Sequence, residues 1–109
     1  MKCIIGVVGY PLYMFRLKIV PSIVNQQPYQ INAQTQRVVW LQNGTSIHLI
    51  PHGEAAHGWR VNKLYYNVAY GKHFFDTIAR QMLCGADAEI EWRDAGFNPV
   101  DPPQWYHGG

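Results

Sequence analysis

The stretch KHFFDTIARQMLC (residues 72–84) decides the predicted fold, because its apolar residues recur at helical spacing. Polar residues occupy the opposite side, and Gly85 follows where a helix commonly needs a left-handed backbone. The stretch therefore predicts an amphipathic helix that lays its phenylalanines onto the inner side of a bent sheet. Its apolar side consists of Phe74, Phe75, Ile78, Met82 and Leu83.

The segments on either side of this helix are predicted strands. Residues 59–70 can form one long strand, and residues 87–94 alternate strictly between apolar and charged side chains, as in a half-buried strand. Residues 95–109 contain Pro99, Pro102 and Pro103, which neither continue a helix nor donate to a sheet. We expect them to form an extended C-terminal tail.

The N-terminal part predicts two further strands. Residues 3–8 form a β-branched run of the kind that is buried on both faces of a sheet. Residues 12–20 alternate, with Tyr13, Phe15, Leu17 and Ile19 on one side, and Pro21 is expected to end that strand. Residues 22–34 are polar and are typical of a long connection.

Residues 36–50 predict a hairpin with a type I′ turn at Asn43-Gly44. A two-residue loop would place Trp40 opposite Ile47 and Val38 opposite Leu49, and this face is the predicted core face.

The order of elements predicts the α+β class: a curled antiparallel sheet or a small OB-like β-barrel of about five to six strands with one amphipathic helix near the C-terminal end. The passage from Tyr70 to Trp92 resembles the strand-helix-strand passage of OB barrels, which include the B subunits of bacterial toxins. That resemblance covers about a quarter of the chain and rests on pattern alone. An open antiparallel sheet crossed by a helix is the alternative.

The chain of 109 residues has room for one core, so we expect a single domain over residues 1–109. Its net charge of +2 comes from scattered basic residues, which disfavours nucleic acid as a partner. Cys3 and Cys84 suit no local metal motif and are expected to be buried free thiols, although a bridge between them stays open. No cofactor is indicated.

Residues 3–15 form an apolar run behind Lys2 that faintly resembles a signal peptide. Pro11 and two glycines interrupt this run, and it is too short to span a bilayer. We expect a cytoplasmic protein without a membrane segment.

One loop could carry catalysis, because His52, Glu54 and His57 lie within six residues. Both residue types ligate zinc, yet this spacing fits neither a helical metalloprotease motif nor a strand pair. The three are weak catalytic candidates, and no metal site is predicted.

A second cluster is rich in aromatic and basic residues and could form a ligand-binding platform or a subunit contact. Oligomerisation is the favoured role, because the chain has more aromatic area than a small core hides. The cluster consists of Trp59, Arg60, Lys63, Tyr65, Tyr66 and Tyr70.

The leading hypothesis is a non-enzymatic binding or interaction module that forms homo-oligomers or holds a small ligand. The first alternative is a small hydrolase or isomerase that uses His52, Glu54 or His57. The second is an OB-like domain for single-stranded nucleic acid, which would need Arg60, Lys63 and Lys72 on one face.

Overall fold

The computed structural model, which describes residues 3–26, 30–51, 58–85 and 87–106, contains one mixed sheet in the order β2-β3-β4-β1-β5-β6. The central strand β1 runs parallel to both of its neighbours, β4 and β5, and β6 runs parallel to β5. β2, β3 and β4 are antiparallel to one another in succession. The strands are β1 (Ile4–Val8), β2 (Ile31–Gln34), β3 (Val38–Leu41), β4 (Ser46–Ile50), β5 (Lys63–Asn67) and β6 (Glu89–Arg93).

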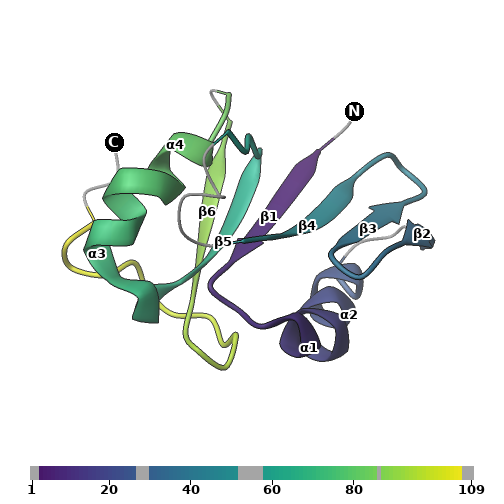
Figure 1. Cartoon of the computed structure of the whole chain (residues 1–109), viewed down its shortest axis with the longest axis horizontal. Helices are drawn as coiled ribbons and strands as arrows, with labels where there is room; N and C mark the ends of the chain where they lie inside the picture. The colour runs from purple at the N-terminus through teal and green to yellow at the C-terminus, as the bar shows by residue number, and fades with distance from the viewer. Residues whose placement is uncertain (1–2, 27–29, 52–57, 86, 107–109) are drawn as a thin grey trace.

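Two helices cover opposite faces of this sheet (Figure 1). The first, residues 12–24, runs without a break through a π-helical middle. The second, residues 68–82, opens with a 3-10 turn, changes direction at Gly71 (φ 79°, ψ −178°) and then runs through a π-helical middle to Met82. The segments of the first are α1 (Leu12–Met14), η1 (Phe15–Ile19) and α2 (Val20–Val24). Those of the second are η3 (Val68–Tyr70), α3 (Gly71–Phe74), η4 (Phe75–Ala79) and α4 (Arg80–Met82).

The predicted α+β class, with its antiparallel sheet or OB-like β-barrel, is wrong. The sheet is open and mostly parallel, so the chain has an α/β fold. The error lies in residues 12–20, which form a helix and not a strand. A helical connection lets a later strand run parallel to the first, whereas a tight hairpin forces the antiparallel arrangement.

Residues 12–20 mislead the prediction because their alternation fits both kinds of element over a short span. Phe15 and Ile19 are buried, as either period requires, but Tyr13 and Leu17 are 69% and 79% exposed. Val20 and Ile23 complete the buried stripe at helical spacing. Pro21 is the second residue after the π-helical segment η1, and the helix continues past it to Val24, so it does not end the element.

The hairpin between β3 and β4 is confirmed, but its predicted register and core face are wrong. Val39 pairs with Ile47 and Trp40 with Ser46, one residue away from the expected pairing. Gly44, with φ of 90°, is the only turn residue in the left-handed region, and Leu41 donates to the carbonyl of Thr45. These features match a three-residue loop with a glycine bulge rather than a type I′ turn.

As a result of this shift, the core face of the hairpin is the one opposite to the prediction. Val39, Leu41, Ile47 and Leu49 pack with the first helix, while Trp40 is 38% exposed on the other face.

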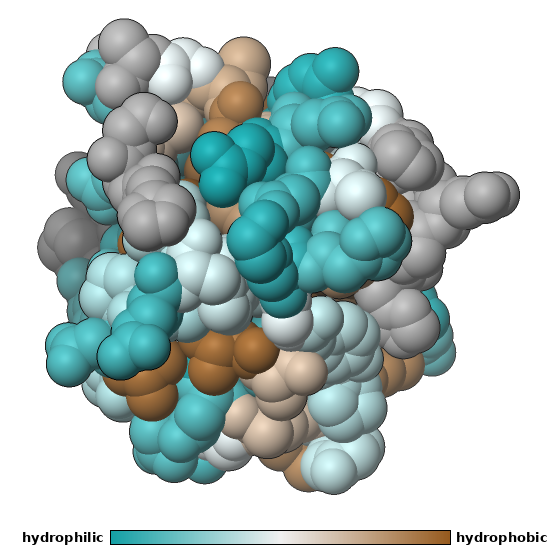
Figure 2. All heavy atoms as spheres, turned by 90° about the vertical axis from the view of Figure 1, so that its left-hand side faces the viewer, coloured by the Kyte–Doolittle hydropathy of each residue, from teal (hydrophilic) through white to brown (hydrophobic). Residues whose placement is uncertain are grey.

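The second helix confirms the prediction for residues 72–84, although it begins earlier and ends at Met82. Phe75, Ala79 and Met82 are buried against β1, β5 and β6, while Phe74 is half-buried on the ring of Tyr66. The outward side of this helix and the tail is mainly hydrophilic, with separate hydrophobic patches (Figure 2).

The strand predicted over residues 87–94 is confirmed as β6 (Glu89–Arg93). Trp92 of β6 faces the second helix, and Trp105 and Tyr106 of the tail pack on it and on Phe75. Phe97 is buried in the core of the first helix, on the other face of the sheet. The residues after β6 therefore contribute to both faces.

Both cysteines are free: Cys3 is half-buried and Cys84 is exposed, so the expected burial fails for Cys84. No helix in the described part of the chain is long and apolar enough to cross a membrane.

Candidate functional site

The predicted His/Glu loop, His52, Glu54 and His57, lies outside the described residues. Across the described ranges no three histidine, cysteine or acidic side chains gather where they could hold a metal ion.

The predicted aromatic platform is divided between the two faces of the sheet. Tyr65 and Tyr66 are neighbours on β5, so they point to opposite sides, and both are buried. The guanidinium of Arg93 lies 5.3 Å from the centre of the Tyr65 ring. The hydroxyl of Tyr66 donates to the carbonyl of Gly71 at 2.6 Å, and burial raises the pKa of this tyrosine. Neither ring is placed to meet a ligand at the surface.

The cations that the nucleic-acid alternative needs are separated: Lys63 lies on β5, Lys72 on the second helix, and Arg60 on neither. Lys63 lies 3.7 Å from Glu91 and 4.0 Å from Glu89, and Lys72 pairs with Asp76 on the second helix. Arg60 is exposed and donates to the carbonyl of Trp59. Tyr70 is 40% exposed at the start of the second helix.

One part of the predicted platform does line a hollow. Trp59 packs edge-on against His48, with ring centres 5.3 Å apart, and with Arg60 they border a hollow of about 410 Å³. This hollow adjoins Gly58, the first described residue after position 57.

A larger hollow is a groove between the first helix and the β2–β3 hairpin, with a volume of about 530 Å³. Such a volume lies within the usual range of ligand sites, about 300–1,000 Å³. We call it the helix-hairpin groove. It is lined by Leu12, Tyr13, Phe15, Arg16, Leu17, Val20, Gln34, Thr35 and Val39.

The floor of the groove is set by the hydrophobic core. Phe15, Val20 and Val39 are all at least 95% buried, so the floor is fixed by packing between the helix and the sheet. Because three core residues hold it, the apolar surface of the groove is preformed.

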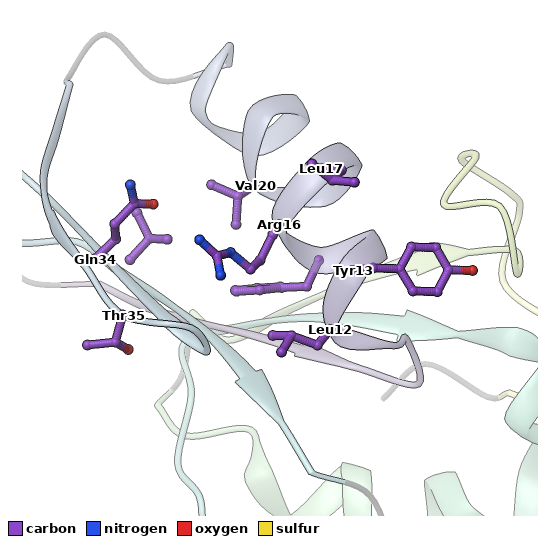
Figure 3. Close-up of a pocket in the computed structure, with 9 residues that line it drawn as sticks. Leu12, Tyr13, Arg16, Leu17, Val20, Gln34 and Thr35 are labelled. Carbon is purple, nitrogen blue, oxygen red and sulfur yellow. The ribbon is translucent and has the colours of Figure 1, made fainter.

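The rim of the groove is polar. Arg16 extends from the first helix toward Gln34 at the end of β2, while Tyr13 points away from both (Figure 3). Thr35 follows Gln34 in the hairpin turn, where its N–H donates to the carbonyl of Val38 at 2.8 Å. Arg16 and Gln34 therefore lie on opposite sides of the opening (Figure 3).

Arg16 is the one charged residue among those that line the groove. None of the ion pairs among the described residues includes Arg16, and no aspartate or glutamate precedes Glu54 in the sequence. Arg37 lies in the same hairpin and borders a hollow of about 320 Å³ beside the ends of β1 and β4. The nearby Lys18 already has a hydrogen-bond partner, because its ammonium donates to the carbonyl of Gly96. The arrangement suits a ligand with an apolar body and a negative group at Arg16.

The sequence predictions miss this groove because the alternation of residues 12–20 indicates a strand. A signal is present: the first half of the chain carries only basic charges, and residues 15, 19, 20 and 23 share one face of a helix. On that helix Arg16 falls beside the buried stripe.

No protein-family model and no curated protein matches the chain. Solved structures do match its fold. The large terminase of a thermophilic bacteriophage, in complex with ADP, superposes with a TM-score of 0.61 at 12% identity. Another crystal form of the same terminase gives 0.62 at 15% identity.

Each match covers 86% of this chain but only 26% of the terminase chain, so the chain is similar to about a quarter of that protein's length. At such identities the likeness concerns the fold alone.

Proposed function

We propose that the chain is a binding module whose helix-hairpin groove takes a ligand with an apolar part and a negatively charged group. The observation that carries this proposal is Arg16, a cation at the rim of an apolar groove without an ion-pair partner among the described residues. The expected class, a non-enzymatic binding module, is retained, and the site moves from the aromatic platform to the groove.

The two parts of the groove contribute differently to binding. The buried floor offers apolar contact, which yields about 25 cal/mol for each Å² removed from water. Arg16 is exposed, so an ion pair there contributes only about 0.2–1 kcal/mol and mainly selects the sign of the ligand's charge. We therefore expect weak affinity for small ligands and a clear preference for anions.

This function can be tested with 3-phenylpropionate and its neutral amide, 3-phenylpropionamide, titrated into the isotopically labelled protein. NMR shifts at Phe15, Val20 and Val39 should be larger for the acid than for the amide at equal concentration. In Arg16→Gln this preference should vanish, whereas Lys72→Gln, on the second helix across the sheet, should keep it. Equal shifts for acid and amide, or no shifts at the groove, would refute the proposal.

Self-association through surface aromatics stays a prediction. The exposed aromatic residues in the described ranges are Tyr13, Trp40 and Tyr70, and Tyr13 lies near the exposed Leu17 on the first helix. If these residues join subunits, Tyr13→Ser with Leu17→Ser should lower the mass measured by sedimentation equilibrium. A monomeric wild-type protein at high concentration would contradict the prediction.

A further inference from the structure

Strand β2 is an open edge of the sheet. It pairs only with β3, and all four of its residues are exposed. The other edge strand, β6, is partly covered by its own tail, because Val100 donates to the carbonyl of Trp92 at 3.1 Å and Asp94 to that of Asn98 at 3.0 Å. In the described part of the chain, β2 has no such cover.

Exposed edges are normally protected by charged side chains, by proline or by irregular backbone. β2 is short and has a register irregularity between Ile31 and Ala33, but its sequence, Ile-Asn-Ala-Gln, carries neither charge nor proline. Within the described ranges only β3 pairs with it, and the edge lacks the charge and proline that most strongly prevent pairing with another strand.

This open edge adjoins the helix-hairpin groove. Gln34 pairs with Val39 and Ile31 with Leu41, and both partners face the first helix, so Ile31 and Gln34 face it too. A strand added beside β2 would lie about 4.8 Å away and send every second side chain to that same face. Those side chains would lie beside Gln34, toward which Arg16 extends (Figure 3).

We propose that β2 takes up an extended peptide as an added strand, with an acidic side chain paired to Arg16 and apolar side chains two residues before and after it lying over the groove. The inference rests on the proposed function and names its ligand class. Backbone hydrogen bonds to β2 do not depend on the sequence of the peptide, whereas the groove selects for its acidic and apolar side chains. The acidic residue is argued from charge, because Arg16 is the one charged residue among those that line the groove and no ion pair of the described residues includes it.

The probe for this inference is the peptide acetyl-Val-Thr-Glu-Thr-Val-Thr-amide, in which valine and glutamate share one face of a strand. The matched control contains glutamine in place of glutamate. On binding, the amides of Ile31–Gln34 should become protected from hydrogen exchange, and the glutamate peptide should bind about two to five times more tightly than its control. In Arg16→Gln the two peptides should bind equally, with protection of β2 unchanged.

The outcomes separate the two proposals. If 3-phenylpropionate shifts the groove but the peptide leaves β2 unprotected, the peptide inference fails and the binding module stands. If neither probe acts on the groove, both fail. Loss of the peptide effect together with dimerisation of the free protein through β2 would mean that a second copy is the occupant, which also overturns the inference.

Discussion

The side-chain amide of Asn67, at the end of β5, donates to the carbonyl of Gly9, just beyond the end of β1, at 2.7 Å. The carbonyl oxygen of the same side chain accepts from the N–H of Ala69 at 3.0 Å, where the second helix begins. Asn67 is buried, so one side chain joins two parallel strands and starts a helix.

Replacing Asn67 with alanine should lower the free energy of unfolding by about 1–3 kcal/mol, because it leaves a buried carbonyl and an N–H without their partner. Urea denaturation followed by tryptophan fluorescence would measure the change. Gln81→Ala removes a similar amide from an exposed helix position and should change stability by less than about 0.5 kcal/mol. Equal effects of the two substitutions would contradict the role of Asn67.

Gly9 should tolerate no side chain. Its φ is 95°, and a β-carbon would lie 2.7 Å from the β-carbon of Asn67. Gly44 has a similar φ of 90°, but a β-carbon there would meet nothing within 4 Å. Gly44→Ala should therefore cost about 1–2 kcal/mol for the backbone alone, and Gly9→Ala about 1–3 kcal/mol more. Thermal unfolding of both variants would show the difference; similar melting temperatures would argue against the close contact.

Two leucines test the corrected fold. Leu17 is 79% exposed on the first helix, whereas Leu64 of β5 is fully buried. Leu64→Ala should lose about 2–5 kcal/mol of stability and Leu17→Ala less than about 0.5 kcal/mol. A strand over residues 12–20, with Leu17 in the core, would require a large loss for Leu17 as well. Chemical denaturation of the two variants distinguishes these arrangements.

Asp94 should make stability depend on acid pH. Hydrogen bonds from the backbone of Asn98, then from its side chain and from the backbone of Gly96, hold the pKa of Asp94 below its ordinary value of 3.8. Since the folded pKa is the lower one, the stabilisation is fully present above the ordinary value and is lost as the pH falls through the folded pKa.

In Asp94→Asn, the loss of stability relative to wild type should be fully present well above pH 3.8 and should shrink as the pH falls through the lowered pKa of the folded Asp94. Urea midpoints measured across this pH range would test this expectation. Asp101→Asn, an exposed carboxylate with no hydrogen bond to the described residues, serves as the control and should show no such change. A constant difference between wild type and Asp94→Asn would contradict the linkage.

The sequence locates several elements correctly because their signals are local. Residues 72–82 repeat apolar residues over three helical turns, and residues 89–93 alternate strictly, so each period is unambiguous. The strand over residues 4–8 is also confirmed, with the burial that is typical of a parallel sheet. A β-branched run of this kind favours a parallel sheet. The alternation of residues 12–20 favours an antiparallel one, because it indicates a second strand directly after the first, and the fold prediction rests on that alternation.

The candidate site could not be located from the periodicity of any single segment. Arg16, the cation of the groove, lies on a helix whose residues also alternate as they would in a strand. Gln34 lies on a strand within a segment whose composition indicates a connection. The predicted aromatic platform fails as a unit because neighbouring residues on β5 point to opposite faces, and both faces of that strand are covered.

The sequence by itself determined the second helix, the central and last strands and the place of the hairpin, because each rests on the conformational period of a single segment. Only the tertiary structure decided that residues 12–24 are helical, which strands pair in parallel, and that Arg16 and Gln34 line one groove. Those features depend on burial against segments far away in the sequence. A short apolar pattern such as that of residues 12–20 fits both a strand and a helix, and only the surface on which it packs decides between them.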